Sequence, residues 1–141
     1  MRHDHAAELK LAASRLDGTA KHTQIIASPV LSEMTGHTIL LKPENLQVTG
    51  SFKIRGAYNK IASLADEELE RGIVTASAGN HAQGVAYAAR ERGAKATILM
   101  PEITPPLKVD ATKAYGADVV LHGEVFDEAA AYAIELSQNE G

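Results

Sequence analysis

Short apolar runs alternate with longer segments of helical periodicity over the second half of the chain. The apolar runs, which predict buried strands, are "IVTA" (73–76), "ATILM" (96–100) and "DVVL" (118–121). The segments with apolar residues at helical spacing, which predict helices, are 80–92, 107–115 and 124–138. Strands that alternate with helices of this length predict βαβ units with right-handed crossovers. The expected fold class is therefore α/β, a parallel sheet with helices on both faces in a three-layer αβα arrangement.

The first half of the chain has a less regular pattern. Residues 6–16 and 51–64 show helical spacing of apolar positions, and Ser51 is placed to cap the second of these helices. The run "TILLK" (38–42) predicts a short buried strand. The stretch "IIASPVL" (25–31), which contains a proline, predicts an irregular connection.

Composition narrows the class of protein. The chain has 141 residues and a net charge of −4, with no dense block of lysine or arginine, so nucleic-acid binding is not expected. No apolar run reaches the roughly 18 residues of a membrane span, and the polar start lacks a signal core, so we expect a cytoplasmic protein. There is no cysteine, which excludes disulfides and Cys-ligated metals. His3 and His5 could bind a metal loosely or could be part of a polar terminus, and no metal site is predicted.

A small polar loop follows the first predicted strand of the sheet. In parallel sheets, ligands bind outside the carboxyl ends of the strands. The segment "SAGNHAQG" (77–84) leads directly into a helix, whose first N–H groups attract anions. Gly79 permits unusual backbone angles, and Ser77 and Asn80 add polar side chains. The same residues could instead cap the helix, and His81 could line a site or be solvated.

A single lysine lies between two large apolar residues in "TGSFKIRG" (49–56). A lysine amine is a nucleophile only when deprotonated, and its ordinary pKa is about 10.4. Burial lowers that pKa. Phe52 and Ile54 are suited to a dry pocket around Lys53, although an ordinary surface lysine of a helix would also fit the pattern.

Three segments together carry a family resemblance. They are "LLKPENLQVTGSFKIRGAYNKI", "VTASAGNHAQGVAYAA" and "LMPEITPPLKVDATKAYGADVVLHG". These segments resemble the threonine dehydratase (threonine ammonia-lyase) family of pyridoxal-phosphate enzymes, which share the fold of the tryptophan synthase β-subunit. The resemblance extends over residues 9–141.

The resemblance implies a role for each candidate residue. Lys53 is expected to bind pyridoxal 5′-phosphate as the internal aldimine and to remove the substrate α-proton, with Phe52 packed near the cofactor ring. Asn80 is expected to hydrogen-bond the ring hydroxyl oxygen. The residues expected around the carboxylate of the amino-acid substrate are Ser77, Gly79, Asn80 and His81.

The implied reaction is the β-elimination of threonine to 2-oxobutanoate and ammonia, or of serine to pyruvate and ammonia. Serine and 3-hydroxyaspartate ammonia-lyases remain alternatives, as does a serine racemase. Racemase relatives carry a second serine where this chain has Ala78, which favours the dehydratase. The segment "ENLQVTGSFKIRG" resembles the shorter, catabolic type of the family, which favours a catabolic role over isoleucine biosynthesis. Outside enzymes, the alternative is a βαβ module that binds a small anion or a partner.

The resemblance also implies a division of the chain. Residues 1–52 are expected to belong to a large cofactor domain that is incomplete here, and residues 53–141 to a nearly complete small αβα domain. Relatives carry their glycine-rich phosphate loop further along. We therefore expect an N-terminal fragment that is inactive alone, and a full-length protein that is a homo-oligomer.

Overall fold

The structure is a computed structural model that describes residues 5–140. His3 lies outside the described residues. The elements, in chain order, are α1 (His5–Leu16), β1 (Ile26–Ala27), α2 (Pro29–Thr35), β2 (Leu40–Leu41), the 3-10 helix η1 (Glu44–Leu46), α3 (Lys53–Ile61), α4 (Asp66–Arg71), β3 (Ile73–Ala76), α5 (Asn80–Glu91), β4 (Ala96–Met100), α6 (Pro106–Lys113), β5 (Asp118–Leu121) and α7 (Phe126–Glu140).

Strands β3, β4 and β5 form a parallel sheet in that order. Ile73 lies opposite Ala96, and Thr97 lies opposite Asp118. Helix α5 joins the first two strands, and α6 joins the second and third. The three strands have the bounds predicted from the apolar runs, and the predicted parallel sheet is confirmed.

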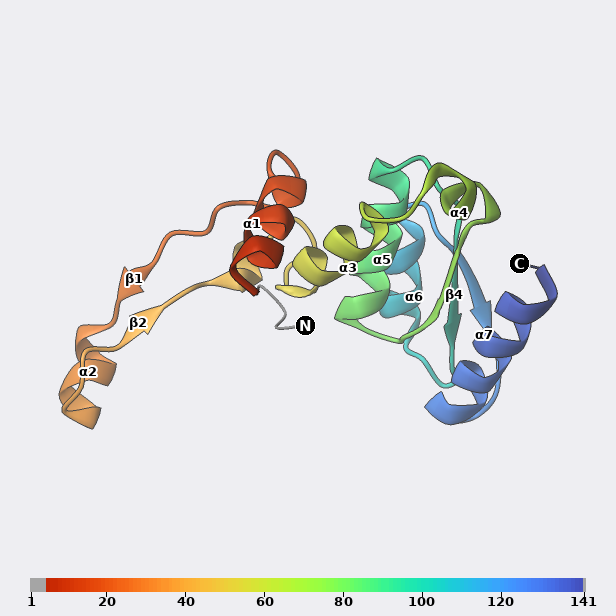
Figure 1. Cartoon of the computed structure of the whole chain (residues 1–141). Coiled ribbons are helices and arrows are strands. Elements are labelled where there is room, and N and C mark those ends of the chain that lie inside the picture. Colours follow the sequence, from red (N-terminus) through yellow and green to blue (C-terminus); the bar gives the residue numbers. More distant parts are fainter. Residues whose placement is uncertain (1–4, 141) are drawn as a thin grey trace.

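Helices cover both faces of this sheet. On β4, Ile98 and Met100 belong to a buried cluster with residues of α3, α5 and α6, whereas Leu99 packs on the other face against Ala129 of α7. Figure 1 shows the resulting layers, with α3, α5 and α6 on one side of the strands and α7 on the other. Full burial of one such side chain contributes about 1.5–3 kcal/mol. The predicted three-layer α/β fold class is confirmed.

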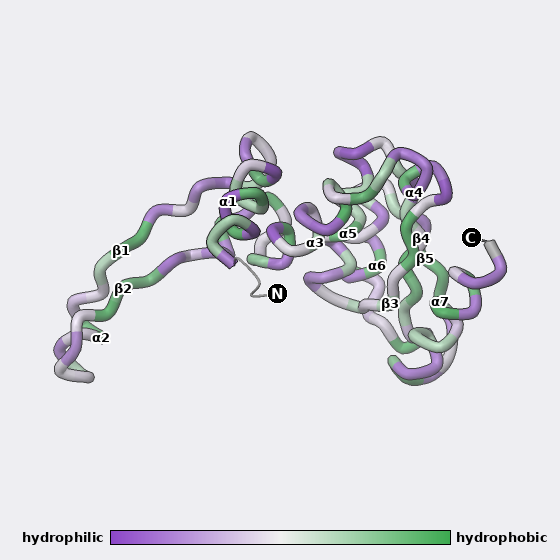
Figure 2. Tube along the Cα trace, viewed as in Figure 1, coloured by the Kyte–Doolittle hydropathy of each residue, from purple (hydrophilic) through white to green (hydrophobic). Residues whose placement is uncertain are grey.

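Residues 5–52 form an arm that extends away from the sheet (Figure 1). Within it, β1 and β2 pair antiparallel, with Ile26 opposite Leu41. Figure 2 shows that this pair is hydrophobic along both strands. Leu40 and Leu41 are 58% and 43% exposed. A strand is present within 38–42, as predicted, but it is not buried, because within residues 5–140 only the two-residue strand β1 pairs with it.

Two further local predictions need correction. The segment 25–31 was predicted to be irregular, but α2 begins within it at Pro29, with Ser28 accepting a hydrogen bond from the Leu31 N–H at 3.4 Å. Proline is favoured at this first position because its missing N–H would have no helical partner. The structure thus uses the proline to start a helix.

The helix predicted over 51–64 is shorter than expected. Helix α3 begins at Lys53 with Phe52 at the N-cap, so Ser51 does not occupy the cap position. Ser51 Oγ instead accepts a long hydrogen bond of 3.4 Å from the Lys53 N–H. A separate short helix, α4, follows after Ile61. None of the described helices is long and apolar enough to cross a membrane.

Candidate active site

The loop between β3 and α5 lies at the carboxyl end of the sheet, as predicted. The Ser77 N–H donates to the Leu99 carbonyl at 3.0 Å, which continues the strand pairing by one residue. Gly79 has a φ of −149°, and a Cβ placed on it would meet nothing within 4 Å. The backbone of Gly79 therefore lies outside the left-handed region that favours glycine.

The first turn of α5 offers unused hydrogen-bond donors. Ser77 Oγ accepts from the Ala82 N–H at 3.2 Å and from the Gly79 N–H at 3.4 Å. The alternative in which Ser77 serves as a local capping group is therefore realised. The N–H groups of Asn80 and His81 have no acceptor within residues 5–140. Such free N–H groups at a helix start attract carboxylate or phosphate.

Helix α3 brings Lys53 directly onto α5. A Cβ at Gly84 would lie 3.2 Å from both the carbonyl carbon and the carbonyl oxygen of Lys53, and 3.3 Å from the Ile54 nitrogen. Only a glycine allows the two backbones to approach this closely without a shift. Sequence reasoning missed Gly84, although an isolated glycine inside a helical pattern is the signal for such a contact.

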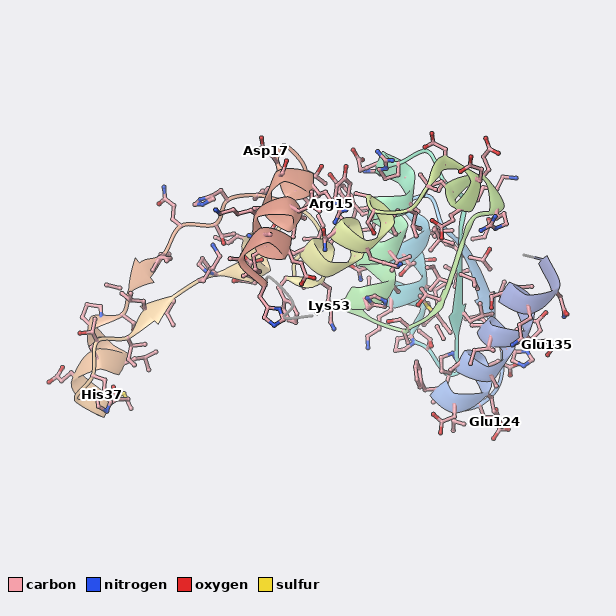
Figure 3. The ribbon with its side chains drawn as sticks, in the orientation of Figure 1. Arg15, Asp17, His37, Lys53, Glu124 and Glu135 are labelled. Atoms are coloured by element: carbon pink, nitrogen blue, oxygen red, sulfur yellow. The ribbon has the colours of Figure 1, made fainter. Side chains whose placement is uncertain are left out.

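The side chain of Lys53 is on the open side of α3. Lys53 is exposed and Phe52 is 60% exposed, with the Lys53 Nζ 5.3 Å from the Phe52 ring centroid. Figure 3 shows the Lys53 side chain pointing away from the helices. Ile54 is fully buried, because it lies on the side of α3 that packs against α5. Phe52 and Ile54 therefore do not form the predicted dry pocket around Lys53 in this chain.

His81 links the loop to the lysine electrostatically. The side chain is half-buried, and this burial lowers the pKa of His81 below its usual value, with the positive charge of Lys53 lowering it further. Both effects favour the neutral imidazole. The structure thus places His81 near enough to Lys53 for their electrostatic interaction, although the two residues are distant along the chain.

A polar hub, consisting of Thr23, Glu44, Gln47 and Arg55, joins the arm to α3. Arg55 donates to both carboxylate oxygens of Glu44, from Nε at 2.8 Å and from Nη2 at 2.9 Å. Thr23 Oγ1 donates to Glu44 Oε1 at 2.6 Å. The Arg55 hydrogen bonds, followed by those from Thr23 and Gln47, lower the pKa of Glu44 to about 2, against the opposing effect of burial.

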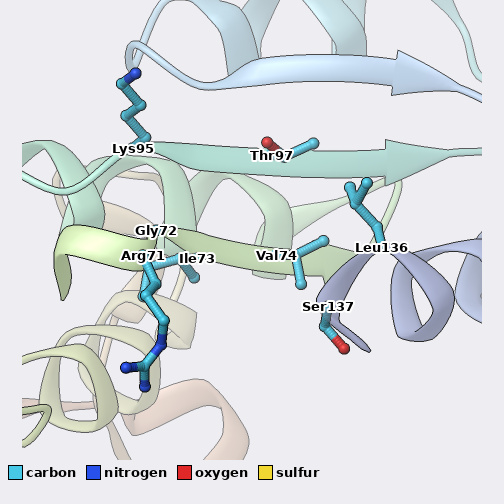
Figure 4. A pocket seen from close by; sticks show the side chains of 8 residues that line it. All are labelled: Arg71, Gly72, Ile73, Val74, Lys95, Thr97, Leu136 and Ser137. Atoms are coloured by element: carbon cyan, nitrogen blue, oxygen red, sulfur yellow. The ribbon is translucent and has the colours of Figure 1, made fainter. Parts of the chain in front are cut away.

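Other features of the described chain lie away from this site. A hollow of about 200 Å³ is found at the amino ends of β3 and β4, at the opposite edge of the sheet. Figure 4 shows that its two cationic side chains, Arg71 and Lys95, point away from each other, so they do not converge on an anion. Residues 5–140 contain no group of three or more His, Asp or Glu side chains that could hold a metal ion.

The chain matches a known protein family over nearly all of its length. The family profile described as "Pyridoxal-phosphate dependent enzyme" matches residues 16–141. The chain belongs to this family. The resemblance found in the lysine and asparagine segments is thereby confirmed, and the expected cofactor is the cofactor of the family.

Individual relatives agree with this assignment. An L-threonine ammonia-lyase from Thermotoga maritima is 53% identical over 134 residues, which are 95% of this chain and 33% of that protein. Threonine deaminase isoform 2 from Solanum lycopersicum has a TM-score of 0.90 at 44% identity, covering 97% of this chain and 40% of that one. Maize serine racemase also has a TM-score of 0.90, at 33% identity, covering 96% of this chain and 41% of that one. The chain spans about a third of the length of the Thermotoga maritima relative.

The polar hub predicts an acid-sensitive contribution to stability. The folded-state pKa of Glu44, about 2, lies below its ordinary value of 4.5. The stabilisation is therefore present above pH 4.5 and is lost as the pH falls towards 2. Glu44→Gln should lower the free energy of unfolding at pH 7 by about 1–3 kcal/mol and flatten its decrease between pH 5 and pH 2.

Denaturant unfolding at several pH values measures this effect. Glu91→Gln is the matched control, because Glu91 also pairs with an arginine, Arg90, at 3.1 Å but on the surface. We expect the pH dependence of the control to follow the wild type. A Glu44→Gln variant with the wild-type pH dependence would contradict the assigned pKa.

Proposed function

We propose that the protein containing this chain catalyses the pyridoxal-phosphate-dependent β-elimination of threonine and serine, with ammonia as a product. The observation that carries the proposal is the backbone contact between Lys53 and Gly84, which holds the amine-bearing residue against the helix whose first N–H groups are free. The relative from Thermotoga maritima, named L-threonine ammonia-lyase, supports the choice of reaction. The proposed substrates are hydroxy-amino acids.

The candidate residues have chemistry that fits the cofactor and the substrate. Lys53 Nζ forms none of the ion pairs found within residues 5–140, so its amine is available to bind the cofactor aldehyde. When bound, the cofactor supplies an electron sink for the charge that develops at the substrate Cα. Lys53, freed by the substrate, takes the α-proton. The exposed side chain of Asn80 is available to hydrogen-bond the cofactor ring hydroxyl.

The substrate carboxylate is assigned to the start of α5. In this proposal, the N–H groups of Asn80 and His81 donate to the carboxylate, and the loop residues Ser77 and Gly79 border it. A neutral His81 can donate a hydrogen bond without adding a second positive charge beside Lys53. This arrangement uses the partial positive charge of a helix N-terminus.

Residues 1–141 alone are proposed to be inactive. Lys53 is exposed, so its amine is surrounded by water rather than by protein in this chain. The arm exposes large apolar side chains, including Ile26, Leu40 and Met34. We assign residues 1–52 to a larger cofactor domain that covers these side chains, and residues 53–141 to the smaller αβα domain.

A first test asks whether Lys53 carries the cofactor. We expect borohydride reduction of the full-length protein with pyridoxal phosphate to label Lys53, and Lys53→Ala to lose both the label and at least about 1,000-fold of the threonine turnover. The matched control is Lys60→Ala on the same helix, which should retain both. Label on Lys60 or Lys42 with none on Lys53, found by peptide mapping, would rule the assignment out. Saturable labelling and turnover by residues 1–141 alone would show that the inactivity proposal is wrong.

A second test separates elimination from racemisation. Maize serine racemase is similar to this chain in fold, so racemisation is the competing reaction. Ala78 has no hydroxyl that could transfer a proton on the second face of the substrate. Ala78→Ser should therefore raise the formation of D-serine from L-serine at least severalfold, measured by chiral chromatography, with Ala78→Val as the size control. An unchanged rate of D-serine formation would remove the argument from Ala78.

A further inference from the structure

The end of α3 that carries Lys53 is weakly held by its own helix. Lys53 is the first residue of α3, and the N-cap residue Phe52 makes no side-chain capping hydrogen bond. The hydrogen bond from the Lys53 N–H to Ser51 Oγ is long, at 3.4 Å. Uncapped helix starts fray, and a missing cap costs about 1 kcal/mol. Something outside α3 must therefore hold this first turn in place.

Arg55, one residue beyond Ile54, provides such an anchor from the side of the arm. Its guanidinium group donates hydrogen bonds to both carboxylate oxygens of Glu44, and Nη2 also donates to the Lys21 carbonyl at 3.1 Å. Its own N–H donates to the Phe52 carbonyl at 3.0 Å, which closes the turn around Lys53. A bidentate arginine–carboxylate pair fixes orientation as well as distance.

The groups that accept hydrogen bonds from Arg55, the Glu44 carboxylate and the Lys21 carbonyl, are themselves held by further contacts. Gln47, only 4% exposed, donates to Glu44 and to the Lys21 carbonyl, the latter at 2.8 Å, and accepts from the Lys21 N–H at 3.0 Å. Lys42 Nζ donates to the Thr23 carbonyl at 2.8 Å. Residues 21–23 and 42–47 are thus tied together beneath Arg55. Such a network is rigid because each member has more than one partner.

We propose that Arg55, held by Glu44, is a positioning residue for Lys53. Gly84 fixes the backbone of Lys53 from the side of α5, and the polar hub fixes the first turn of α3 from the opposite side. Together they set the direction in which the Lys53 amine leaves the helix. A displacement of about 1 Å at a reacting group can lower a rate by about 100-fold. The catalytic consequence rests on the proposed function, whereas the anchoring of α3 does not.

The test compares three variants of the full-length protein. Arg55→Met removes both the positive charge and the bidentate hydrogen bonds to Glu44. Arg55→Lys keeps the charge but cannot form the bidentate pair. Arg15→Met is the matched control, because Arg15 also joins the arm to α3, by donating to Asn59 Oδ1 at 3.2 Å, but near the far end of that helix. Two quantities are measured: amide hydrogen exchange of residues 51–55 without cofactor, and kcat and KM for threonine.

We expect Arg55→Met to speed exchange of residues 51–55 by more than about tenfold and to lower kcat by about 10–100-fold, with KM changed less than about threefold. Arg55→Lys should lie between Arg55→Met and the wild type, and it carries the same test if Arg55→Met does not fold. Arg15→Met should change neither quantity by more than about threefold.

Three results would overturn the positioning role. The first is exchange of residues 51–55 that is no faster in the Arg55 variants than in Arg15→Met. The second is an unchanged kcat with an unchanged KM. The third is an unchanged kcat with a raised KM, which would assign Arg55 to substrate binding. If the wild type itself neither labels at Lys53 nor turns over threonine, the proposed function fails, and the exchange measurement still decides whether Arg55 anchors α3.

Discussion

Two helix backbones meet at Gly84, and the rest of the candidate site depends on that contact. The carbonyl group of Lys53 occupies space that any larger residue at position 84 would need. Glycine inside a helix costs about 0.5–1 kcal/mol relative to alanine. The buried face of α3, which includes Ile54, Ala57 and Ile61, offsets that cost. The amine-bearing residue and the free N–H groups of α5 are thereby part of one packed unit.

Two different kinds of interaction complete this unit. The sheet and its helices are held by apolar packing, with Ile98, Leu99 and Met100 fully buried. The arm is attached mainly through polar contacts, in which Glu44 and Arg55 are the central pair. Hydrogen bonds to charged groups depend on direction, whereas apolar packing is not directional. A polar attachment therefore suits the first turn of α3, where the direction of the Lys53 side chain matters.

The sequence predicted those parts of the structure in which the local pattern and the packing agree. The three strands were found because continuous apolar runs are buried on both faces of a parallel sheet. An apolar run predicts burial but does not state what covers it, and within residues 5–140 Leu40 and Leu41 are exposed. Ile54 is buried while Lys53 is exposed, because neighbours in sequence leave a helix on different sides. The glycine at position 84 was a signal for a close contact, but neither its partner nor that of Arg55 could be predicted, because both partners are distant along the chain.

The direct packing of the Lys53 backbone against Gly84 can be measured by nuclear Overhauser effects between α3 and α5. One α-proton of Gly84 points along the direction in which a Cβ would lie 3.3 Å from the Ile54 nitrogen. We expect a strong effect between that proton and the Ile54 amide proton. The absence of this effect, in spectra that show the sequential effects within both α3 and α5, would contradict this packing.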